Sequence, residues 1–320
     1  MKNIFIVLCG MSLFLSACKE PKEEGPYLIF KMKLDSTQVR LNSFGQPTDV
    51  PADHEAQTPD FKGISVHYIE LSQSPLTAVG AGAVLYKAAE VETGGTPAKA
   101  IDFAQETIVN NGEVFFKIPL KDVAAGTYQY LRASLAYQAY EVQMYFDTTI
   151  TYNYLGTNYT GTISQEFPCY VSSFIGFNTY IQNLTVKDTT IAINANKLQG
   201  FWATKTYGTA NVNFSGLGTY PYPVNVLSTG QAPAGATTVV NPLFNSSPIP
   251  AGSCLVTGPF ENNSLVITGD ETSDVTVEMS LSINKSFEWT KVVADGKYEP
   301  FKGEMVVDMG VRGMIARILP

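Results

Sequence analysis

The feature that most constrains the fold is strict alternation of apolar and polar side chains. It is clearest in the segment DVTVEMSLSIN, residues 274–284. The apolar set is Val275, Val277, Met279, Leu281 and Ile283, and the intervening set is Thr276, Glu278, Ser280 and Ser282. Because successive strand side chains point to opposite faces, this period of two predicts a strand with one buried and one solvated face. The segment GEVFFKIPL, residues 112–120, repeats the pattern. Its predicted buried face comprises Val114, Phe116, Ile118 and Leu120.

Other β-rich segments occur along the whole chain. They are YLIFKMKL (27–34), ISVHYIEL (64–71), TYQYLRASLAYQ (127–138), AYEVQMYF (139–146), CYVSSFIGF (169–177), TTIAINANKLQGFWAT (189–204), ANVNFS (210–215) and SLVITG (264–269). Many short strands separated by turn-rich pieces predict an all-β fold, with antiparallel immunoglobulin-like β-sandwich architecture and long loops. Very little helix is expected. Only residues 97–109 are predicted to be helical, and residues 215–250, rich in Gly, Pro, Ser and Thr, are predicted to form a long loop.

The segment LKDVAAGTYQY, residues 120–130, bears on the type of sandwich. Asp122 followed by Gly126-Thr127-Tyr128 resembles the corner at which immunoglobulin-like folds turn into a strand and bind a tyrosine hydroxyl to nearby backbone. A tight turn before any tyrosine-rich strand would have the same sequence pattern, so both interpretations stand.

Composition limits the partners of this chain. Of its 320 residues, 45% are apolar and 12% aromatic, which is ample material for a core and argues against global disorder. The net charge is −8 and no cluster of Lys or Arg is visible. Because nucleic-acid binding depends on neutralising phosphates, this charge pattern argues against it.

The length favours two domains or one enlarged β domain. We predict a signal peptide at residues 1–17, a flexible tether at 18–26, an N-terminal β-sandwich at 27–147 and a C-terminal β domain at 148–320. The last boundary rests on the Thr-, Asn- and Gly-rich stretch FDTTITYNYLGTNYTG, residues 146–161. No repeat period is visible, which argues against a solenoid.

The first residues resemble a bacterial export leader. Lys2 precedes an apolar run from Ile4 to Leu15, which is shorter than the roughly 20 residues that a membrane-spanning helix needs. Leu15-Ser16-Ala17-Cys18 resembles the lipobox of bacterial lipoproteins, which implies acylation of Cys18 and a lipid anchor in the outer membrane. The alternative is a secreted protein with an incidental cysteine.

The polar stretch after Cys18 suits a solvated tether. Within it, Lys22-Glu23-Glu24 resembles the surface-export signal of Bacteroidota lipoproteins, which implies display at the cell surface. An ordinary charged linker is the alternative. Two further cysteines, Cys169 and Cys254, could form a disulfide in an oxidising envelope or remain as two buried thiols.

Few residues offer catalytic chemistry. The sequence has no Gly-x-Ser-x-Gly elbow, no His-Glu-x-x-His and no phosphate-binding or dinucleotide glycine motif. We therefore expect no enzyme activity. A glycosidase of the paired-carboxylate type leaves no spacing signature, so that class stays open.

A metal-binding site is a more specific alternative to an enzyme active site. The region PADHEAQTPDFKGISVHY, residues 51–68, contains both histidines of the chain, His54 and His67, together with Asp53, Glu55 and Asp60. Two imidazoles and a carboxylate could hold copper or zinc. The plainer interpretation is a solvated acidic loop and one hydrogen-bonded histidine.

Two acidic clusters raise the question of calcium. They are Asp270, Glu271 and Asp274, and Asp295, Glu299, Glu304 and Asp308. An EF-hand register around Gly296 puts Lys291, Val293 and Lys302 at ligand positions, which excludes that motif. Surface turns are the plainer interpretation.

A family resemblance bears on the metal question. The segments ISVHYIEL and NKLQGFWAT resemble parts of methanobactin-partner-type copper-binding envelope proteins, which implies a β-sandwich lipoprotein or secreted protein with a copper role. No copper ligand of that family maps onto this chain. More broadly, the chain resembles Bacteroidota outer-membrane lipoproteins.

Aromatic residues could serve binding. Trp202 and Trp289 could stack on a sugar ring, although aromatics on strands more often fill a core. The function we expect is therefore non-catalytic binding of a glycan, a protein partner or a small ligand, with copper handling through His54 and His67 as the alternative.

Overall fold

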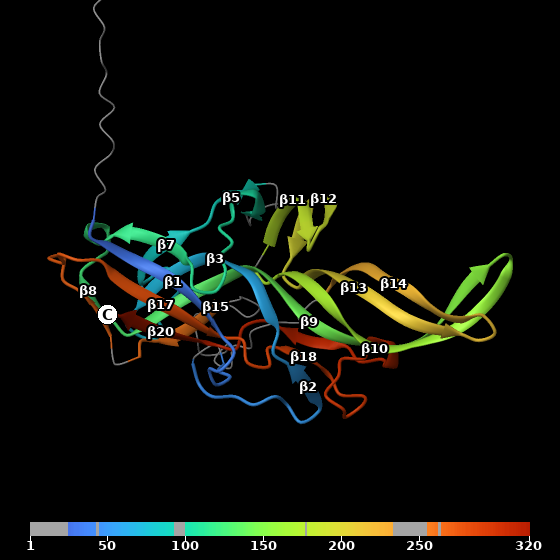
Figure 1. Cartoon of the computed structure of the whole chain (residues 1–320). Helices are drawn as coiled ribbons and strands as arrows, with labels where there is room; N and C mark the ends of the chain where they lie inside the picture. The colour runs from blue at the N-terminus through green and yellow to red at the C-terminus, as the bar shows by residue number, and fades with distance from the viewer. Residues whose placement is uncertain (1–24, 43–44, 93–99, 177, 233–254, 262–263) are drawn as a thin grey trace, which may run out of the picture.

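The computed structural model describes residues 25–42, 45–92, 100–176, 178–232, 255–261 and 264–320. These residues form β-strands, short 3-10 turns and connecting segments, and none of them lies in an α-helix. The predicted all-β, sandwich-like class is confirmed (Figure 1).

The strands within these ranges form five sheets. The largest has the order β14 (Gly218–Gln231), β13 (Phe201–Phe214), β10 (Thr157–Phe174), β9 (Tyr130–Tyr154), β3 (Asp60–Ser72) and β4 (Ala83–Lys87), with β15 (Leu255–Pro259) also paired to β9. A four-stranded sheet has the order β20 (Met314–Leu319), β17 (Val275–Ser282), β1 (Tyr27–Asp35) and β7 (Val114–Pro119). The smaller sheets are β12 (Thr189–Leu198), β11 (Asn178–Val186), β6 (Ala100–Asp102) and β5 (Glu90–Val91); β19 (Val306–Met309), β18 (Phe287–Thr290) and β2 (His54–Gln57); and β16 (Leu265–Ile267) with β8 (Gly126–Tyr128). The 3-10 turns are η2 (Phe103–Gln105), η3 (Leu120–Asp122) and η4 (Pro300–Lys302).

The main core lies between the β20-β17-β1-β7 sheet and the part of the largest sheet formed by β3, β4, β9 and β15. One layer contributes Leu28, Phe30, Met32, Val277, Met279 and Leu281, and the other contributes Ile64, Val66, Ile69, Leu71, Leu131, Ala133, Leu135 and Val256. The alternation in β1 and β17 thus buries one face of each strand, as predicted. Burial of these side chains is the main source of the sandwich's stability.

Strands from the two ends of the described chain meet in the middle of the four-stranded sheet. β1 and β17 pair in parallel, with Leu28 opposite Val275 and Leu34 opposite Leu281. The boundary that we predicted at residue 147 falls inside β9, which continues unbroken to Tyr154. Strands on either side of that boundary therefore share sheets.

The second face of β17 is not solvated toward its end, which corrects the sequence prediction. Ser280 and Ser282 are both buried. The segment after β1 covers them, because the Ser280 hydroxyl donates to Gln38 Oε1 at 2.7 Å and the Ser282 hydroxyl donates to the Gln38 carbonyl at 3.0 Å. Small hydroxyl side chains allow this close approach of a second backbone segment.

The predicted face of β7 was also partly wrong. A β-bulge shifts the β1–β7 register between Phe30 and Lys31, which places Phe115 in the core and exposes Val114. Phe116 and Ile118 are only partly buried, while Leu120 is buried as expected. A bulge changes which residues share a face, and alternation alone does not reveal it.

The predicted helix at 97–109 is wrong over its described residues. Ala100–Asp102 forms β6, which pairs in parallel with β11, and Phe103–Gln105 forms a single 3-10 turn capped by Asp102. Val109 then bridges to Ile64. Packing of this segment against the sheets overrides its weak helix propensity.

The predicted loop at 215–250 is wrong in its first part, because Gly218–Gln231 forms β14. Pro221 and Pro223 are tolerated there because β14 lies at the edge of its sheet among the described strands. Residues 233–250 lie outside the described residues. The hydroxyl of Tyr128 donates to the Ala124 carbonyl at 2.7 Å, so the predicted bond between this tyrosine and nearby backbone is present.

Two long hairpins, β9–β10 and β13–β14, extend away from the sandwich as an arm (Figure 1). The arm is defined here as residues 142–171 and 202–231. At its tip, Leu155 and Gly156 both have positive φ, 47° and 83°, the geometry of a two-residue hairpin turn. Apolar side chains fill one face of the arm: Phe146, Ile163, Phe167, Ala210, Val212, Phe214 and Val224.

A buried ion pair joins the sandwich strands β3 and β9. Arg132 Nη1 donates to Glu70 Oε2 at 2.9 Å, and both side chains are fully buried. Glu70 Oε1 also accepts from the backbone N–H groups of Gly80 and Gly82, at 3.1 and 2.6 Å. Arg132 donates to the Thr77 carbonyl at 2.8 Å. The pair thus fastens the connection between β3 and β4 to the sheet.

Replacing Glu70 by Leu should destabilise the protein by about 3–5 kcal/mol, because the buried Arg132 guanidinium would lose its counter-charge. Chemical denaturation of the purified protein measures this free energy of unfolding. The matched control is Glu261→Leu, which breaks the more exposed pair between Glu261 and Arg317 and should cost under about 1 kcal/mol. Equal losses in the two variants would contradict the prediction.

Candidate functional site

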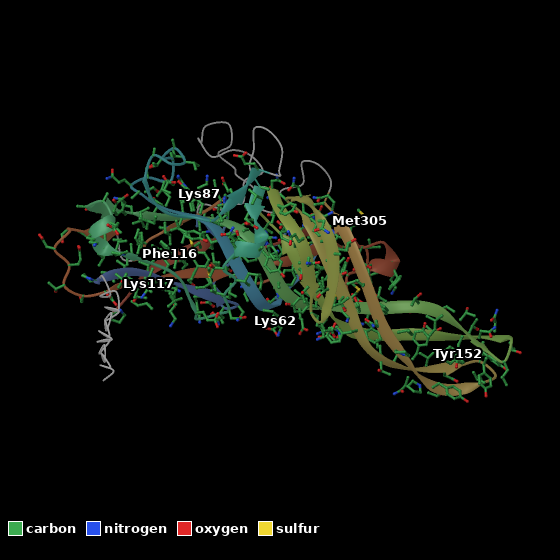
Figure 2. All side chains as sticks on the ribbon, turned by 90° about the horizontal axis from the view of Figure 1, so that it is seen from above. Lys62, Lys87, Phe116, Lys117, Tyr152 and Met305 are labelled. Atoms are coloured by element: carbon green, nitrogen blue, oxygen red, sulfur yellow. The ribbon has the colours of Figure 1, made fainter. Side chains whose placement is uncertain are left out.

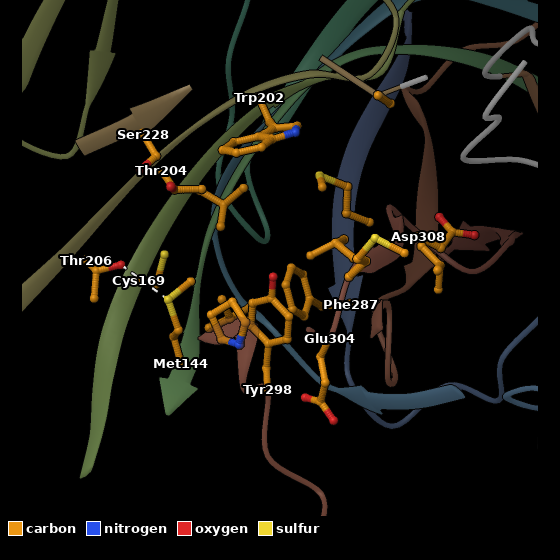
Figure 3. A pocket seen from close by; sticks show the side chains of 18 of the residues that line it. Met144, Cys169, Trp202, Thr204, Thr206, Ser228, Phe287, Tyr298, Glu304 and Asp308 are labelled. Carbon is orange, nitrogen blue, oxygen red and sulfur yellow. Dashed lines mark hydrogen bonds between the residues drawn. The ribbon is translucent and has the colours of Figure 1, made fainter. Parts of the chain in front are cut away.

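A cavity of the described structure lies at the base of the arm. It has a volume of about 500 Å³ and opens between the arm sheet and the segment that runs from β18 to β19 (Figure 3). This volume is within the usual range for small-molecule sites.

One wall of the pocket is a single face of four strands. Cys169 on β10 lies opposite both Val142 on β9 and Thr206 on β13, and Thr206 lies opposite Val226 on β14. Directly opposed residues in antiparallel strands point to the same side. The same face therefore presents Val142, Met144, Phe146, Cys169, Val171, Trp202, Thr204, Thr206, Val226 and Ser228 to the pocket.

Trp202 occupies a fixed place on this wall. Its cross-strand partner is Gly230, and a Cβ added there would lie only 2.3 Å from Trp202 Cζ2. The indole therefore rests directly on the Gly230 backbone, and only glycine leaves room for it. Figure 3 shows the ring directed into the pocket. Trp289, by contrast, is fully buried in a core with Phe287 and Tyr298.

The opposite wall comes from the C-terminal part of the chain. It consists of Phe287, Tyr298, Pro300, Phe301, Met305, Val306, Val307 and Met309, with the side chains of Glu304 and Asp308 beside them. Phe287 and Tyr298 pack edge to face, with ring centroids 5.3 Å apart. Phe301 packs against Phe146 of the arm, with ring centroids 4.9 Å apart. This contact joins the two walls.

The mouth of the pocket carries exposed apolar side chains. Phe301 is 57% exposed and Met305 is 65% exposed. Both side chains line the pocket and are also open to solvent, so they lie at its opening. These two residues therefore mark the side from which a ligand would enter.

Few polar groups in the pocket are free to bind a ligand. Glu304 accepts hydrogen bonds from the backbone N–H groups of Val293, at 3.1 Å, and Glu299, at 2.7 Å, so its carboxylate shapes the loop. The Thr206 hydroxyl contacts Met144 Sδ at 3.7 Å. Gln231 Nε2 donates to the Gln199 carbonyl at 2.7 Å, so Thr204 and Ser228 remain as uncharged groups along the arm wall. The site can thus hold an apolar body and orient it through a few hydrogen bonds.

Cys169 lies in this pocket wall as a buried free thiol. Cys254, its predicted disulfide partner, lies outside the described residues. Burial raises the pKa of the Cys169 thiol to about 11, and the thiolate is the reactive form.

Cys169 should therefore resist alkylation in the folded protein at pH 8 and react readily after denaturation. Peptide mapping by mass spectrometry after iodoacetamide treatment follows this residue separately from the other cysteines. Rapid modification of Cys169 under native conditions would contradict its burial and raised pKa.

The predicted metal ligands are placed in different local environments. His54 on β2 contacts Glu288 Oε2 through Nδ1 at 3.2 Å, and His67 on β3 contacts Glu90 Oε1 through Nε2 at 3.1 Å. Burial lowers the pKa of His67. Asp60 pairs with Lys62, and Asp53 lies 4.0 Å from His54.

Within the described residues, no group of three or more His, Cys, Asp or Glu side chains has the geometry to hold a metal ion. This finding covers the described members of the two acidic clusters considered for calcium. Several of those carboxylates have other roles: Glu271 accepts from the Thr268 N–H at 2.6 Å, Glu299 pairs with Lys302 at 3.0 Å, and Asp308 pairs with Arg312 at 2.7 Å.

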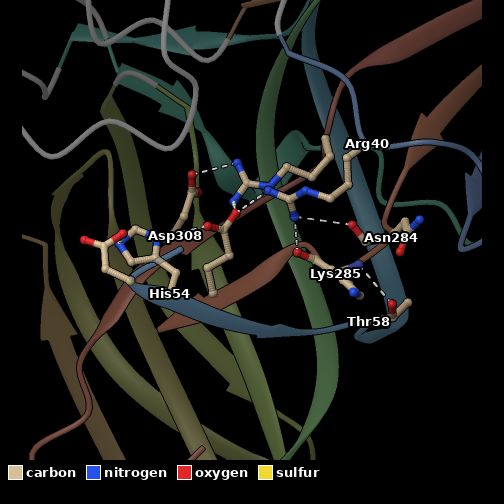
Figure 4. Close-up of polar contacts among 9 residues, drawn as sticks. Arg40, His54, Thr58, Asn284, Lys285 and Asp308 are labelled. Atoms are coloured by element: carbon tan, nitrogen blue, oxygen red, sulfur yellow. Dashed lines mark hydrogen bonds and ion pairs between the residues drawn. The ribbon is translucent and has the colours of Figure 1, made fainter. Parts of the chain in front are cut away.

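His54 belongs to a charge network behind the C-terminal wall of the pocket (Figure 4). Glu288 lies at its centre and accepts from Arg40 Nη2 at 2.6 Å and also from Arg312. Burial acts to raise the pKa of Glu288, but the two guanidinium groups outweigh it and lower the pKa. Asp308 completes the network through Arg312. The network fastens the segment after β1 to β18 and β19.

Sequence reasoning missed a buried acid beside Ser65 of β3. Glu106 follows η2, and both its carboxylate oxygens are buried. Burial raises the pKa of Glu106 from its ordinary value of 4.5 to about 7, and the neighbouring Asp102 charge adds to this effect. Between these pH values the folded protein binds more protons than the unfolded chain, so stability falls as the pH rises.

Replacing Glu106 by Gln should therefore make the protein more stable than the wild type above pH 7, by roughly 1–3 kcal/mol. Below about pH 4.5 the two should be similar, because Glu106 is then protonated in both folded and unfolded chains. Denaturation curves at several pH values measure the difference. Glu166→Gln, on the exposed face of β10, is the control and should follow the wild type throughout.

Comparison of the chain with protein-family models, with curated proteins and with solved structures finds no match. In the described part of the chain, no helix has the length and apolar character needed to cross a membrane.

Proposed function

We propose that this chain is a non-catalytic binding protein, and that its ligand is a small molecule with an apolar body held in the pocket at the base of the arm. The observation that carries the proposal is the pocket itself. Two apolar walls from distant parts of the chain enclose about 500 Å³, and exposed Phe301 and Met305 stand at its mouth.

The wall chemistry favours this ligand class over a glycan. Sugar hydroxyls need several polar partners in a buried site, since an unsatisfied hydroxyl is costly. The pocket offers Thr204, Thr206, Ser228 and Asp308 Oδ1, which has no hydrogen-bond partner among the described residues. Glu304 and Gln231 are engaged with backbone. An apolar body with one or two polar groups matches these walls better.

The geometry gives the copper-handling alternative no comparable support. His54 and His67 contact different carboxylates on different strands. The predicted localisation remains part of the proposal. A lipid anchor at Cys18 would hold the binding domain at the outer membrane, facing the cell surface. Its support is the leader sequence and the tether, residues 18–26, which is directly followed by β1 at Tyr27.

Binding of Nile red, a neutral apolar dye, tests the pocket. Ser228→Trp places a large ring in the cavity and should weaken Nile red binding about tenfold or more, because a filled pocket leaves no apolar volume. Thr229→Trp adds the same side chain on the opposite face of β14 and should leave binding unchanged. Fluorescence titration of the purified variants measures both affinities.

Equal binding by wild type, Ser228→Trp and Thr229→Trp would show that the dye binds elsewhere and would overturn the assignment of the pocket. As a separate test of the pocket, mass spectrometry of an organic extract of the purified wild type identifies a natural ligand that co-purifies with it. That ligand should be absent from the Ser228→Trp extract and present in the Thr229→Trp extract.

A further inference from the structure

The outer part of the arm carries no charge. Residues 148–165 and 206–231 contain no Asp, Glu, Lys or Arg, although such residues make up 16% of the whole chain. Figure 2 shows Tyr152 far out on the arm, whereas Lys62, Lys87 and Lys117 lie on the body. Exposed strands usually carry charged side chains, which discourage pairing with other chains.

The two edges of the arm differ in what they offer to another strand. On β14, the Ala232 N–H donates to the Gly200 carbonyl, so even-numbered amides face β13 and odd-numbered amides face outward. Pro221 and Pro223 occupy outward positions and remove two donors. Proline at such positions is a common protection of a sheet edge.

The β9 edge lacks this protection. Its odd-numbered amides face outward, because the Gln143 N–H donates to Gln57 Oε1 and the Tyr145 N–H donates to the Tyr298 carbonyl, both at 2.8 Å. Near Asp147, the edge meets Lys302 of η4. Beyond it, among the residues the structure describes, Thr148–Tyr154 pairs with β10 on one side and with no strand on the other.

We propose that Thr148–Tyr154 of β9 pairs antiparallel with the same segment of a second copy of this chain, joining two arms into one continuous sheet. The inference does not depend on the pocket. Outward amides must face outward amides, so a two-fold axis through Thr151 places Thr151 opposite itself and Thr149 opposite Asn153 of the second copy.

In this register, each side chain of the segment faces a side chain of the second copy with which it can form a favourable contact. On one face, Thr151 meets its own copy and Thr149 meets Asn153, pairs that can hydrogen-bond. On the other face, Ile150 meets Tyr152 of the second copy, an aromatic–β-branched pair of the kind that stabilises sheets. Any charge within this segment would be brought close to its own copy by the two-fold axis. The absence of charge therefore favours a second copy as the occupant.

Sedimentation of the purified protein over a wide concentration range tests the pairing. The wild type should show reversible dimers. Thr151→Lys sets two like charges opposite each other and should weaken the dimer about fivefold or more. Asn211→Lys adds the same charge on β13 of the same arm, away from the edge, and should leave the dimer unchanged.

The register can be tested independently by oxidation. Opposed residues of a hydrogen-bonded pair have Cα atoms about 5.5 Å apart, within the range a disulfide spans. Thr151→Cys should therefore form a disulfide-linked dimer. Thr149→Cys should not, since the two copies of residue 149 would lie about 14 Å apart.

A wild type that stays monomeric at every concentration would overturn the proposal. So would dimers that Thr151→Lys and Asn211→Lys weaken equally, which would place the contact elsewhere. Equal crosslinking of the two cysteine variants would reject this register. Circular dichroism of each variant confirms that a lost dimer does not reflect a lost fold.

Discussion

The structure depends on one unusually long strand. β9 runs for 25 residues, whereas strands of globular proteins are usually about 3–10 residues long. Its first part pairs with β3 and β15 in the sandwich, and its later part pairs with β10 in the arm. Body, pocket wall and arm edge are therefore successive stretches of the same strand, and their relative orientation is set by its twist.

The two walls of the pocket are held by different interactions. The arm wall is a hydrogen-bonded sheet, in which Val142, Cys169 and Thr206 are aligned by backbone ladders. The opposite wall depends on side chains: Glu288 and its two arginines fix β18 and β19 to the segment after β1. Phe301 contacts Phe146 across the gap. The position of the second wall therefore depends on the ion pairs of Glu288 with Arg40 and Arg312.

The alternation of apolar and polar side chains predicted strands well, because it follows from the burial of one strand face. It correctly predicted β1 and β17, where one face meets the main core. It failed at Ser280 and Ser282, which a distant segment covers, and at Val114, which a bulge turns outward. The pocket left no signal, because Val142, Cys169, Thr206 and Phe287 are far apart in the chain. His54 and His67 are close in sequence, but their strands pair with different partners.

The parallel pairing of β1 with β17 has a consequence for how the chain reaches its native state. The Tyr27 N–H donates to Asp274, across a sequence separation of 247 residues. Such contacts carry a large loop-closure cost and make folding slow. The central pair of the four-stranded sheet cannot close until β17, which begins directly after Asp274, has been synthesised. A ribosome-bound nascent chain would therefore expose the apolar face of β1 throughout elongation, which gives a chaperone a long time in which to bind it.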